Sequence, residues 1–155
     1  MTRAEKAVAL HKGGSSCSQA VFTVFAEDFG LNEELAHRLS TGLGGGIGRL
    51  GLSCGALTGG VLALSLAFGS ATGADQDAKM KTYEVVSKFM ADMEARHGST
   101  QCRTLLEGAD LWTEAGRAEV KAKNLGDKVC NTLVAEAVEY VEGAIAQILR
   151  GKSNG

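Results

Sequence analysis

Four cysteines are the residues of this chain best suited to chemistry, and they lie far apart in the sequence. They are Cys17, Cys54, Cys102 and Cys130, and no two of them form a C-x-x-C pair. The chain therefore lacks both a thioredoxin-type motif and the paired spacing of a zinc ribbon. Because the thiolate is the form that attacks disulfides and binds metals, thiol–disulfide exchange and metal binding are the two chemistries to consider.

Each cysteine falls in the expected first turn of a helix. A favoured N-cap residue precedes every one of them: Ser15 or Ser16 before Cys17, Ser53 before Cys54, Ser99 three residues before Cys102, and Asp127 three residues before Cys130. Unpaired backbone N–H groups and the positive end of the helix dipole favour an anion at this position. We therefore expect the pKa of these thiols to be lowered from about 8.5 toward neutrality.

Helical spacing also places each cysteine on an apolar face. Cys17 aligns with Val21, Val24 and Phe25, and Cys130 aligns with Leu133, Val134, Ala137 and Val141. Cys54 and Cys102 are followed by leucines at the same spacing. We expect all four thiols to point into the core, where they could converge on one site. The alternative for any single cysteine is that it serves only as a small buried hydrophobe.

The segment from Gly42 to Gly60 is unusually rich in glycine and contains Cys54. Nine of its 19 residues are glycine. Gly46, Gly48 and Gly51 match the letters of a dinucleotide fingerprint, but the preceding residues read as the end of a helix and not as the strand that such a site requires. We expect a loop that passes close to the cysteines and offers N–H groups to an anion or a cluster. The candidate cofactor-binding residues are Gly46, Gly48, Gly51 and Gly55.

Composition favours an all-α fold. The 155-residue chain has no proline and few aromatic residues, and it shows no sustained alternation of polar and apolar residues. Its net charge is −2 and it has no basic patch, so nucleic acid is not an expected partner. We predict a single four-cysteine domain over residues 1–150, followed by a frayed tail over residues 151–155. The domain should be a bundle of about six helices in which the glycine-rich loop leads into a buried central helix.

The positions of the helices follow from caps and breakers. Expected helices run from Thr2 to Lys12, Ser15 to Phe29, Asn32 to the glycine-rich loop, Ser53 to about Gly69, Asp75 to Gly98, Ser99 to Leu106 and Asp127 to Arg150. The polar region between Gly108 and Gly126 should be irregular chain with a short exposed helix. The three histidines, His11, His37 and His97, are isolated in the sequence, and we expect them to cap helices or lie on the surface.

One segment is long enough to raise the question of a membrane span. Leu50 to Ala74 carries no charge, but its glycines, serines and threonines favour a buried central helix over a membrane helix. The N-terminal residues carry scattered charges and no apolar core typical of a signal peptide, so a cytoplasmic location is expected. In a reducing compartment, redox chemistry or metal binding is favoured over structural disulfides.

The cysteine contexts resemble a known family. GSSCSQAVF around Cys17, the sequence CGALTG from Cys54 to Gly59, QCRTLL around Cys102, and finally Cys130 are similar to the C_GCAxxG_C_C family of small redox-active proteins. The similarity extends from Cys17 to about Tyr140. It implies a helical domain of this length whose defining residues are the four cysteines, and a frequent genomic position beside transporter genes. It implies no particular substrate.

The leading hypothesis is a thiol–disulfide oxidoreductase acting on an unknown redox partner protein or a small thiol. Cys54, beside the loop, would be the attacking thiolate, and a second cysteine would resolve the mixed disulfide. The alternative is that Cys17, Cys54, Cys102 and Cys130 ligate a metal or an iron–sulfur cluster. A third hypothesis is a structural helical module. Gly55 and Gly59 would permit close packing of helices or, in a homodimer, of subunits.

Overall fold

The protein is all-α, as predicted. The computed structural model describes residues 1–153, apart from the side chains of residues 149, 152 and 153. Within this part it has eight α-helices and no strand. These are α1 (Arg3–Lys12), α2 (Cys17–Ala26), α3 (Glu33–Ser40), α4 (Gly55–Phe68), α5 (Gln76–His97), α6 (Cys102–Leu105), α7 (Glu114–Ala122) and α8 (Asn131–Ser153). Short 3₁₀ segments η1 (Glu27–Phe29) and η2 (Thr41–Leu43) and a π-helical segment η3 (Gly126–Cys130) complete the helical structure.

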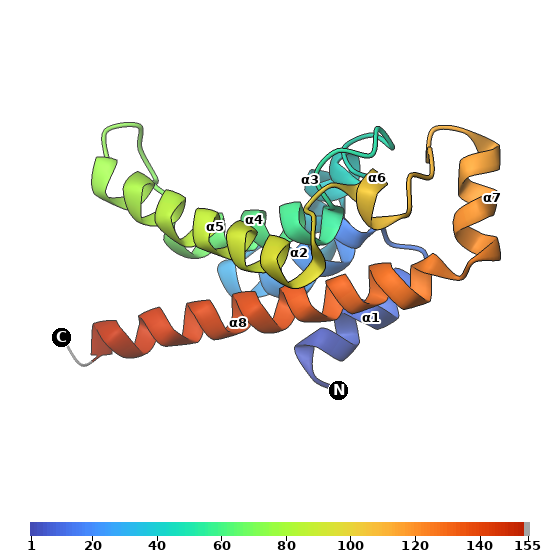
Figure 1. Ribbon diagram of the computed structural model, residues 1–155. Coiled ribbons are helices and arrows are strands. Elements are labelled where there is room, and N and C mark those ends of the chain that lie inside the picture. Colours follow the sequence, from blue (N-terminus) through green and yellow to red (C-terminus); the bar gives the residue numbers. More distant parts are fainter. Residues whose placement is uncertain (154–155) are drawn as a thin grey trace.

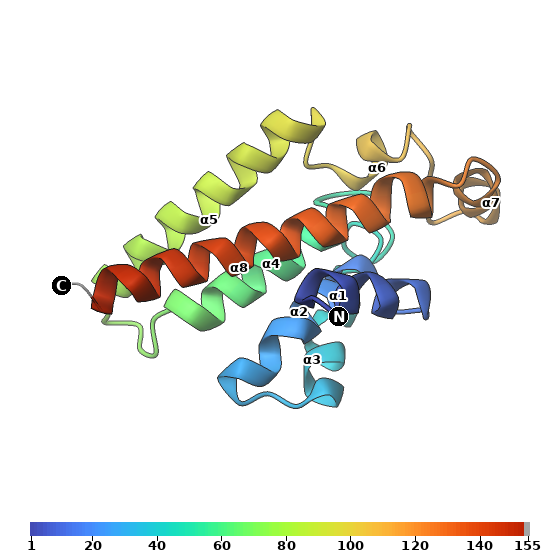
Figure 2. The ribbon, with the colours of Figure 1, turned by 90° about the horizontal axis from the view of Figure 1, so that it is seen from below.

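The long helix α8 is the support of the fold. It runs along the molecule with α4 and α5 beside it and with α1 and α2 packed near its N-terminal half (Figures 1 and 2). The largest fully buried side chains come from α2, α4, α5 and α8 and include Phe25, Leu57, Phe89 and Val138. Since α6 and α7 lie together at the end of the molecule where α8 begins, this end carries most of the irregular chain (Figure 1).

Glycine on α4 lets α2 approach closely, as expected. A Cβ added at Gly59 would stand 2.8 Å from the Ser18 carbonyl oxygen, and one added at Gly55 would stand 3.0 Å from the Ser18 nitrogen. No side chain fits in that space without moving one of the helices. The glycine face of α4 is therefore occupied by α2 of the same chain.

Most helix starts are where the caps predict them. Thr2 and Ser16 form capping boxes with Glu5 and Gln19, and Asn32 and Asp75 cap α3 and α5. Ser53 was expected to cap α4, but Cys54 is the N-cap residue, so that prediction was wrong. The prediction of Ser99 as the N-cap of α6 was also wrong. Gln101 takes that place, and the Ser99 hydroxyl accepts a hydrogen bond from the Gln101 N–H instead.

The glycine-rich loop is a compact turn in which the backbone bonds mainly to itself. Gly48 N–H donates to the Gly42 carbonyl, and Gly51 N–H donates to the Gly45 carbonyl. The turn places even Ile47 and Arg49 at positive φ. After it, Leu52–Cys54 pairs with Thr100–Cys102: Cys54 N–H donates to the Thr100 carbonyl at 2.8 Å, and Cys102 N–H donates to the Leu52 carbonyl at 2.6 Å.

Within the uncharged segment, 14 residues form the helix α4, which contributes Leu57 and Leu64 to the core. Among the described residues, no helix has the length and apolar character needed to cross a membrane. At the C-terminus, α8 continues to Ser153, beyond the expected helix end at Arg150. Of the tail predicted over residues 151–155, residues 154 and 155 lie outside the described part of the chain.

Candidate thiol site

The structure brings the four cysteines close enough to affect one another. Ionisation of Cys17 is opposed electrostatically by Cys130, Cys54 and Cys102, and ionisation of Cys102 is opposed by Cys54 and Cys130. The thiols thus form one cluster although they belong to four separate segments of the chain. Cys54 and Cys102 are buried, whereas Cys17 and Cys130 are partly exposed.

Three of the four cysteines stand at helix starts, as predicted. Cys17 is the first residue of α2 after its cap Ser16, Cys54 is the N-cap residue of α4, and Cys102 is the first residue of α6. The prediction was wrong for Cys130, because helical structure begins before it, in η3. Cys130 is the last residue of this π-helical segment. Such π-bulges are frequent at functional sites.

Cys17 and Cys130 form a pair in which one thiol supports ionisation of the other. A hydrogen bond from the Cys17 thiol lowers the pKa of Cys130 below its ordinary value of 9.0, although burial opposes this. The same interaction, together with burial and the other two thiols, raises the pKa of Cys17 well above 9.0. Cys130 is therefore the thiol that ionises first, and Cys17 is its protonated neighbour.

The expectation that Cys54 would have a lowered pKa was wrong. Burial raises the pKa of Cys54 to about 11, and the Ala56 and Leu57 N–H groups at the start of α4 offset only part of this effect. Burial and the neighbouring thiols raise the pKa of Cys102 to about 12. A helix start favours a thiolate, but loss of water disfavours it more when the sulfur belongs to the core.

His11 joins the cluster, contrary to its expected role as a cap or surface residue. Its Nε2 atom lies 3.5 Å from the Cys17 sulfur, and its Nδ1 atom lies 2.5 Å from Asn131 Oδ1. The Asn131 amide in turn donates to Asp127 Oδ1 at 2.8 Å. One sequence signal pointed to this contact: the Gly13–Gly14 turn between α1 and α2 lets α1 fold back toward the start of α2. No pattern in the sequence linked His11 or Cys17 to Asn131, which lies more than 100 positions farther along the chain.

The four candidate glycines divide between packing and turn formation. A Cβ added at Gly46 would stand 2.7 Å from the Cys102 Cβ, and one at Gly55 would stand 3.3 Å from the Cys17 Cβ. Gly51 packs against Arg103 in the same way, while nothing lies within 4 Å of an added Cβ at Gly48. Because the Gly48 and Gly51 N–H groups bond within the loop, they are not free for an anion, and this part of the prediction was wrong.

Comparison with known proteins relates most of the chain to a family. The family model described as "Putative redox-active protein (C_GCAxxG_C_C)" matches residues 15–144, a segment that contains all four cysteines. The chain belongs to this C_GCAxxG_C_C family. No curated protein and no solved structure matches it.

Membership of the C_GCAxxG_C_C family supports a redox role and does not distinguish thiol exchange from metal binding. In the described part of the chain, no three His, Cys, Asp or Glu side chains are arranged so that they could hold a metal ion. The four thiols are near enough for electrostatic effects, which extend farther than metal–ligand bonds. The described residues thus do not form a ready metal centre.

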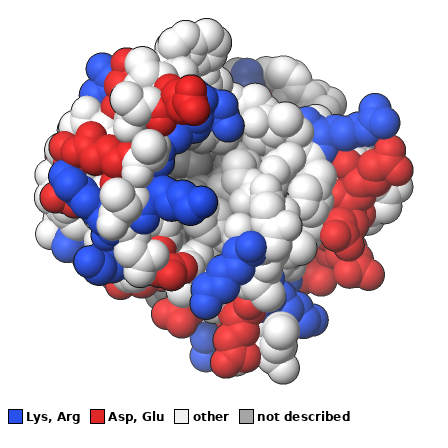
Figure 3. Space-filling view, turned by 90° about the vertical axis from the view of Figure 1, so that its right-hand side faces the viewer, with Lys and Arg blue, Asp and Glu red and all other residues white. Residues whose placement is uncertain are grey.

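The molecule is hollowed on the side where α7 lies. Figure 3 faces the side on which α7 lies and shows a hollow with largely uncharged walls and with Lys and Arg on its rim. A pocket between the glycine-rich loop and α7 includes Ser16, Gly44, Arg49 and Arg117, and so borders the residue before Cys17.

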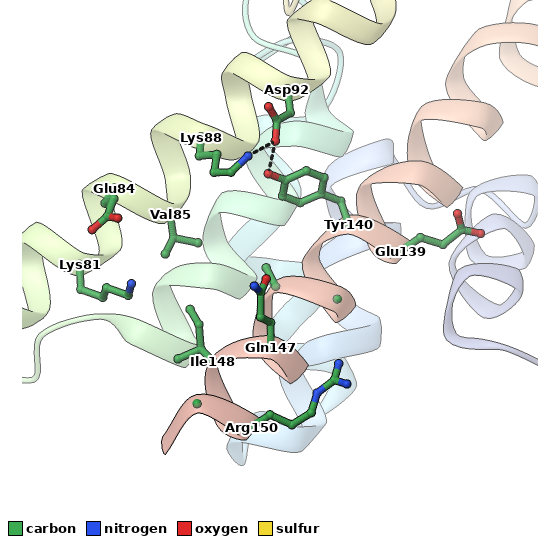
Figure 4. Close-up of a pocket in the computed structure, with 13 residues that line it drawn as sticks. Lys81, Glu84, Val85, Lys88, Asp92, Glu139, Tyr140, Gln147, Ile148 and Arg150 are labelled. Carbon is green, nitrogen blue, oxygen red and sulfur yellow. Dashed lines mark hydrogen bonds and ion pairs between the residues drawn. The ribbon is translucent and has the colours of Figure 1, made fainter. Parts of the chain in front are cut away.

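A separate pocket lies between α5 and α8 (Figure 4). Here Asp92 accepts hydrogen bonds from Lys88 at 2.8 Å and from the Tyr140 hydroxyl at 2.5 Å, which joins the two helices. None of its described lining residues is a cysteine or a histidine. This pocket is therefore distinct from the thiol cluster.

Proposed function

We propose that this protein is a dithiol redox protein in which Cys130 and Cys17 exchange with a disulfide of a partner protein or a small thiol. The proposal is supported by the pairing of Cys17 with Cys130, which lowers the pKa of Cys130, and by the contact of the Cys17 sulfur with His11 Nε2 at 3.5 Å. A thiol–disulfide oxidoreductase needs one accessible thiol that ionises readily and a second thiol beside it. Cys130 and Cys17 form such a pair, and both residues are more exposed than the buried Cys54 and Cys102.

The reaction proceeds in two exchanges. The Cys130 thiolate attacks one sulfur of the substrate disulfide, so that a mixed disulfide forms and the other substrate sulfur leaves as a thiolate, which takes a proton from water. Cys17 then loses its proton and attacks the Cys130 sulfur. The second substrate sulfur leaves, and a Cys17–Cys130 disulfide remains. Two electrons pass from the two cysteines to the substrate, and a reducing thiol in a compartment such as the cytoplasm would restore the dithiol.

Cys54 and Cys102 have a supporting role in this proposal. Both are buried and have strongly raised pKa values, so both are thiols near neutral pH. A protonated, buried thiol is a poor nucleophile. They line the cluster and keep the surroundings of Cys17 apolar.

The test is to trap the mixed disulfide. With the aromatic disulfide 5,5′-dithiobis(2-nitrobenzoate), Cys17→Ser should retain one thionitrobenzoate group on Cys130, identified by peptide mass spectrometry. Cys130→Ser should lose the rapid reaction, and Cys102→Ser, the matched control, should retain it. A label trapped mainly on Cys54 or Cys102 would overturn the assignment. Stoichiometric metal in anaerobically purified protein, released on replacement of any one cysteine, would replace the proposal with metal binding.

A further inference from the structure

The hydrogen bonds around His11 determine which of its ring nitrogens carries a proton. The Asp127 carboxylate can only accept, so the Asn131 NH₂ group points to it and the Asn131 oxygen points to His11. The nitrogen that faces that oxygen, Nδ1, must donate. In the neutral ring, Nε2 is then left with a lone pair, and this lone pair faces the Cys17 sulfur at 3.5 Å.

We propose that His11 is the general base that takes the proton of Cys17 when Cys17 resolves the mixed disulfide, and that Asn131 is the residue that positions it. This inference rests on the proposed function and adds a catalytic residue to it. His11 touches the reacting sulfur atom directly, whereas Asn131 and Asp127 act only through His11.

Cys17 needs such a base because of its position in the pair. Its pKa is raised well above the ordinary value, so few molecules have a Cys17 thiolate near neutral pH. Once Cys130 is part of a mixed disulfide, it can no longer accept the Cys17 proton. The His11 ring contacts the Cys17 sulfur from α2 and the Asn131 oxygen from α8, and the Asp127 carboxylate from η3 is linked to the ring through Asn131.

The resolving step exchanges one disulfide bond for another and moves one proton. The Cys17 S–H bond breaks and the proton moves to His11 Nε2, which gives an imidazolium whose Nδ1–H still donates to Asn131. The Cys17 sulfur forms a bond to the Cys130 sulfur, and the bond from Cys130 to the substrate sulfur breaks. The substrate sulfur takes the electron pair of that bond and leaves as a thiolate. The imidazolium then gives its proton to this thiolate or to water.

The experiment measures the two exchanges separately on the full-length protein. With 5,5′-dithiobis(2-nitrobenzoate) in a stopped-flow instrument, attack by Cys130 releases a first equivalent of coloured thionitrobenzoate, and resolution by Cys17 releases a second. In His11→Gln, the first release should keep its rate. The second should slow by about 100-fold or more near neutral pH, which is the usual contribution of a general base.

The pH profile separates a catalytic role from a structural one. In His11→Gln, the second release should accelerate about tenfold per pH unit, since it then depends only on the Cys17 thiolate fraction. The wild type should show a weaker dependence. His97→Gln is the matched control: His97 bonds to Glu136 and lies on α5, and this variant should leave both releases unchanged.

The outcomes distinguish this inference from the function on which it rests. If the wild type shows no second release, the dithiol function fails. If His11→Gln shows a second release at the wild-type rate, only the role of His11 is overturned. Should His11→Gln not fold, Asn131→Ala is measured in the same way. A slowed second release would support the proposal, and an unchanged one would overturn it.

Discussion

Gly46 lies directly against Cys102, and a methyl group added at position 46 would stand 2.7 Å from the Cys102 Cβ. The glycine-rich loop thus touches the thiol cluster at a point where no side chain fits. Gly46 also has a φ of 71°, which favours glycine. The loop holds Cys102 in place through this contact and through the Leu52 carbonyl, which accepts from the Cys102 N–H.

Gly46→Ala should therefore cost much more stability than the same change at Gly48. Both residues have positive φ, but nothing lies within 4 Å of an added Cβ at Gly48. We expect a loss of about 1 kcal/mol for Gly48→Ala from backbone strain, and about 3 kcal/mol or more for Gly46→Ala, where overpacking adds to it. Urea unfolding followed by circular dichroism measures both. Equal losses of stability in the two variants would mean that the loop accommodates the added methyl group at Gly46 without a further cost in stability.

Removing the Cys17 thiol should make Cys130 less reactive. In Cys17→Ala, the Cys130 thiolate loses its hydrogen-bond donor, so the pKa of Cys130 should rise. The rate of alkylation of Cys130 by iodoacetamide, plotted against pH, should then rise at higher pH than in the wild type. Cys102→Ala is the control, since Cys102 is not among the groups that shift the pKa of Cys130. An unchanged Cys130 profile in Cys17→Ala would show that the two thiols do not interact.

The fold could be predicted from the sequence because the sequence signals for its helices are local. Capping boxes at Thr2 and Ser16, the absence of proline and the smooth glycine face at Gly55 and Gly59 predict helices and their close packing without knowledge of distant contacts. Cys17 at a helix start followed from the same reasoning. The apolar face beneath each cysteine allowed the thiols to meet, but whether they do so could not be read from the sequence.

The reactivity of the individual thiols could not be predicted from the sequence. Cys54 was predicted to be the attacking thiolate because a helix start lowers the pKa of a thiol. The burial that reverses this effect depends on tertiary packing. The pairing of Cys130 with Cys17, and of His11 with Asn131, joins residues from opposite ends of the chain. The π-helical segment that places Cys130 has no recognisable sequence signal. These are properties of the assembled core, and local patterns do not contain them.

Tyr140→Phe should lower stability without altering the thiol chemistry. The change removes the hydroxyl that donates to Asp92 and joins α8 to α5 (Figure 4). We expect the melting temperature to fall by a few degrees, while both thionitrobenzoate releases keep their wild-type rates. Differential scanning calorimetry and the stopped-flow assay test the two parts. A slowed release in this variant would connect the α5–α8 pocket with the thiol cluster.

The raised pKa of Cys54 predicts a loss of stability at alkaline pH. Folding raises this pKa from an ordinary value of 9.0 to about 11, so the thiol is favoured by the folded state and the thiolate by the unfolded state. This contribution to stability is complete below pH 9 and is lost as the pH rises through 11. By the linkage relation it can reach about 2–3 kcal/mol.

Cys54→Ala isolates that contribution. The free energy of unfolding in urea should fall less steeply between pH 9 and 11 in this variant than in the wild type, because the variant has no thiol at this position. Gly48→Ala serves as the control, since it is destabilised without loss of a titrating group and should keep the wild-type slope. If Cys54→Ala also keeps the wild-type slope, burial does not hold Cys54 protonated, and Cys54 would again be a candidate for the attacking thiol.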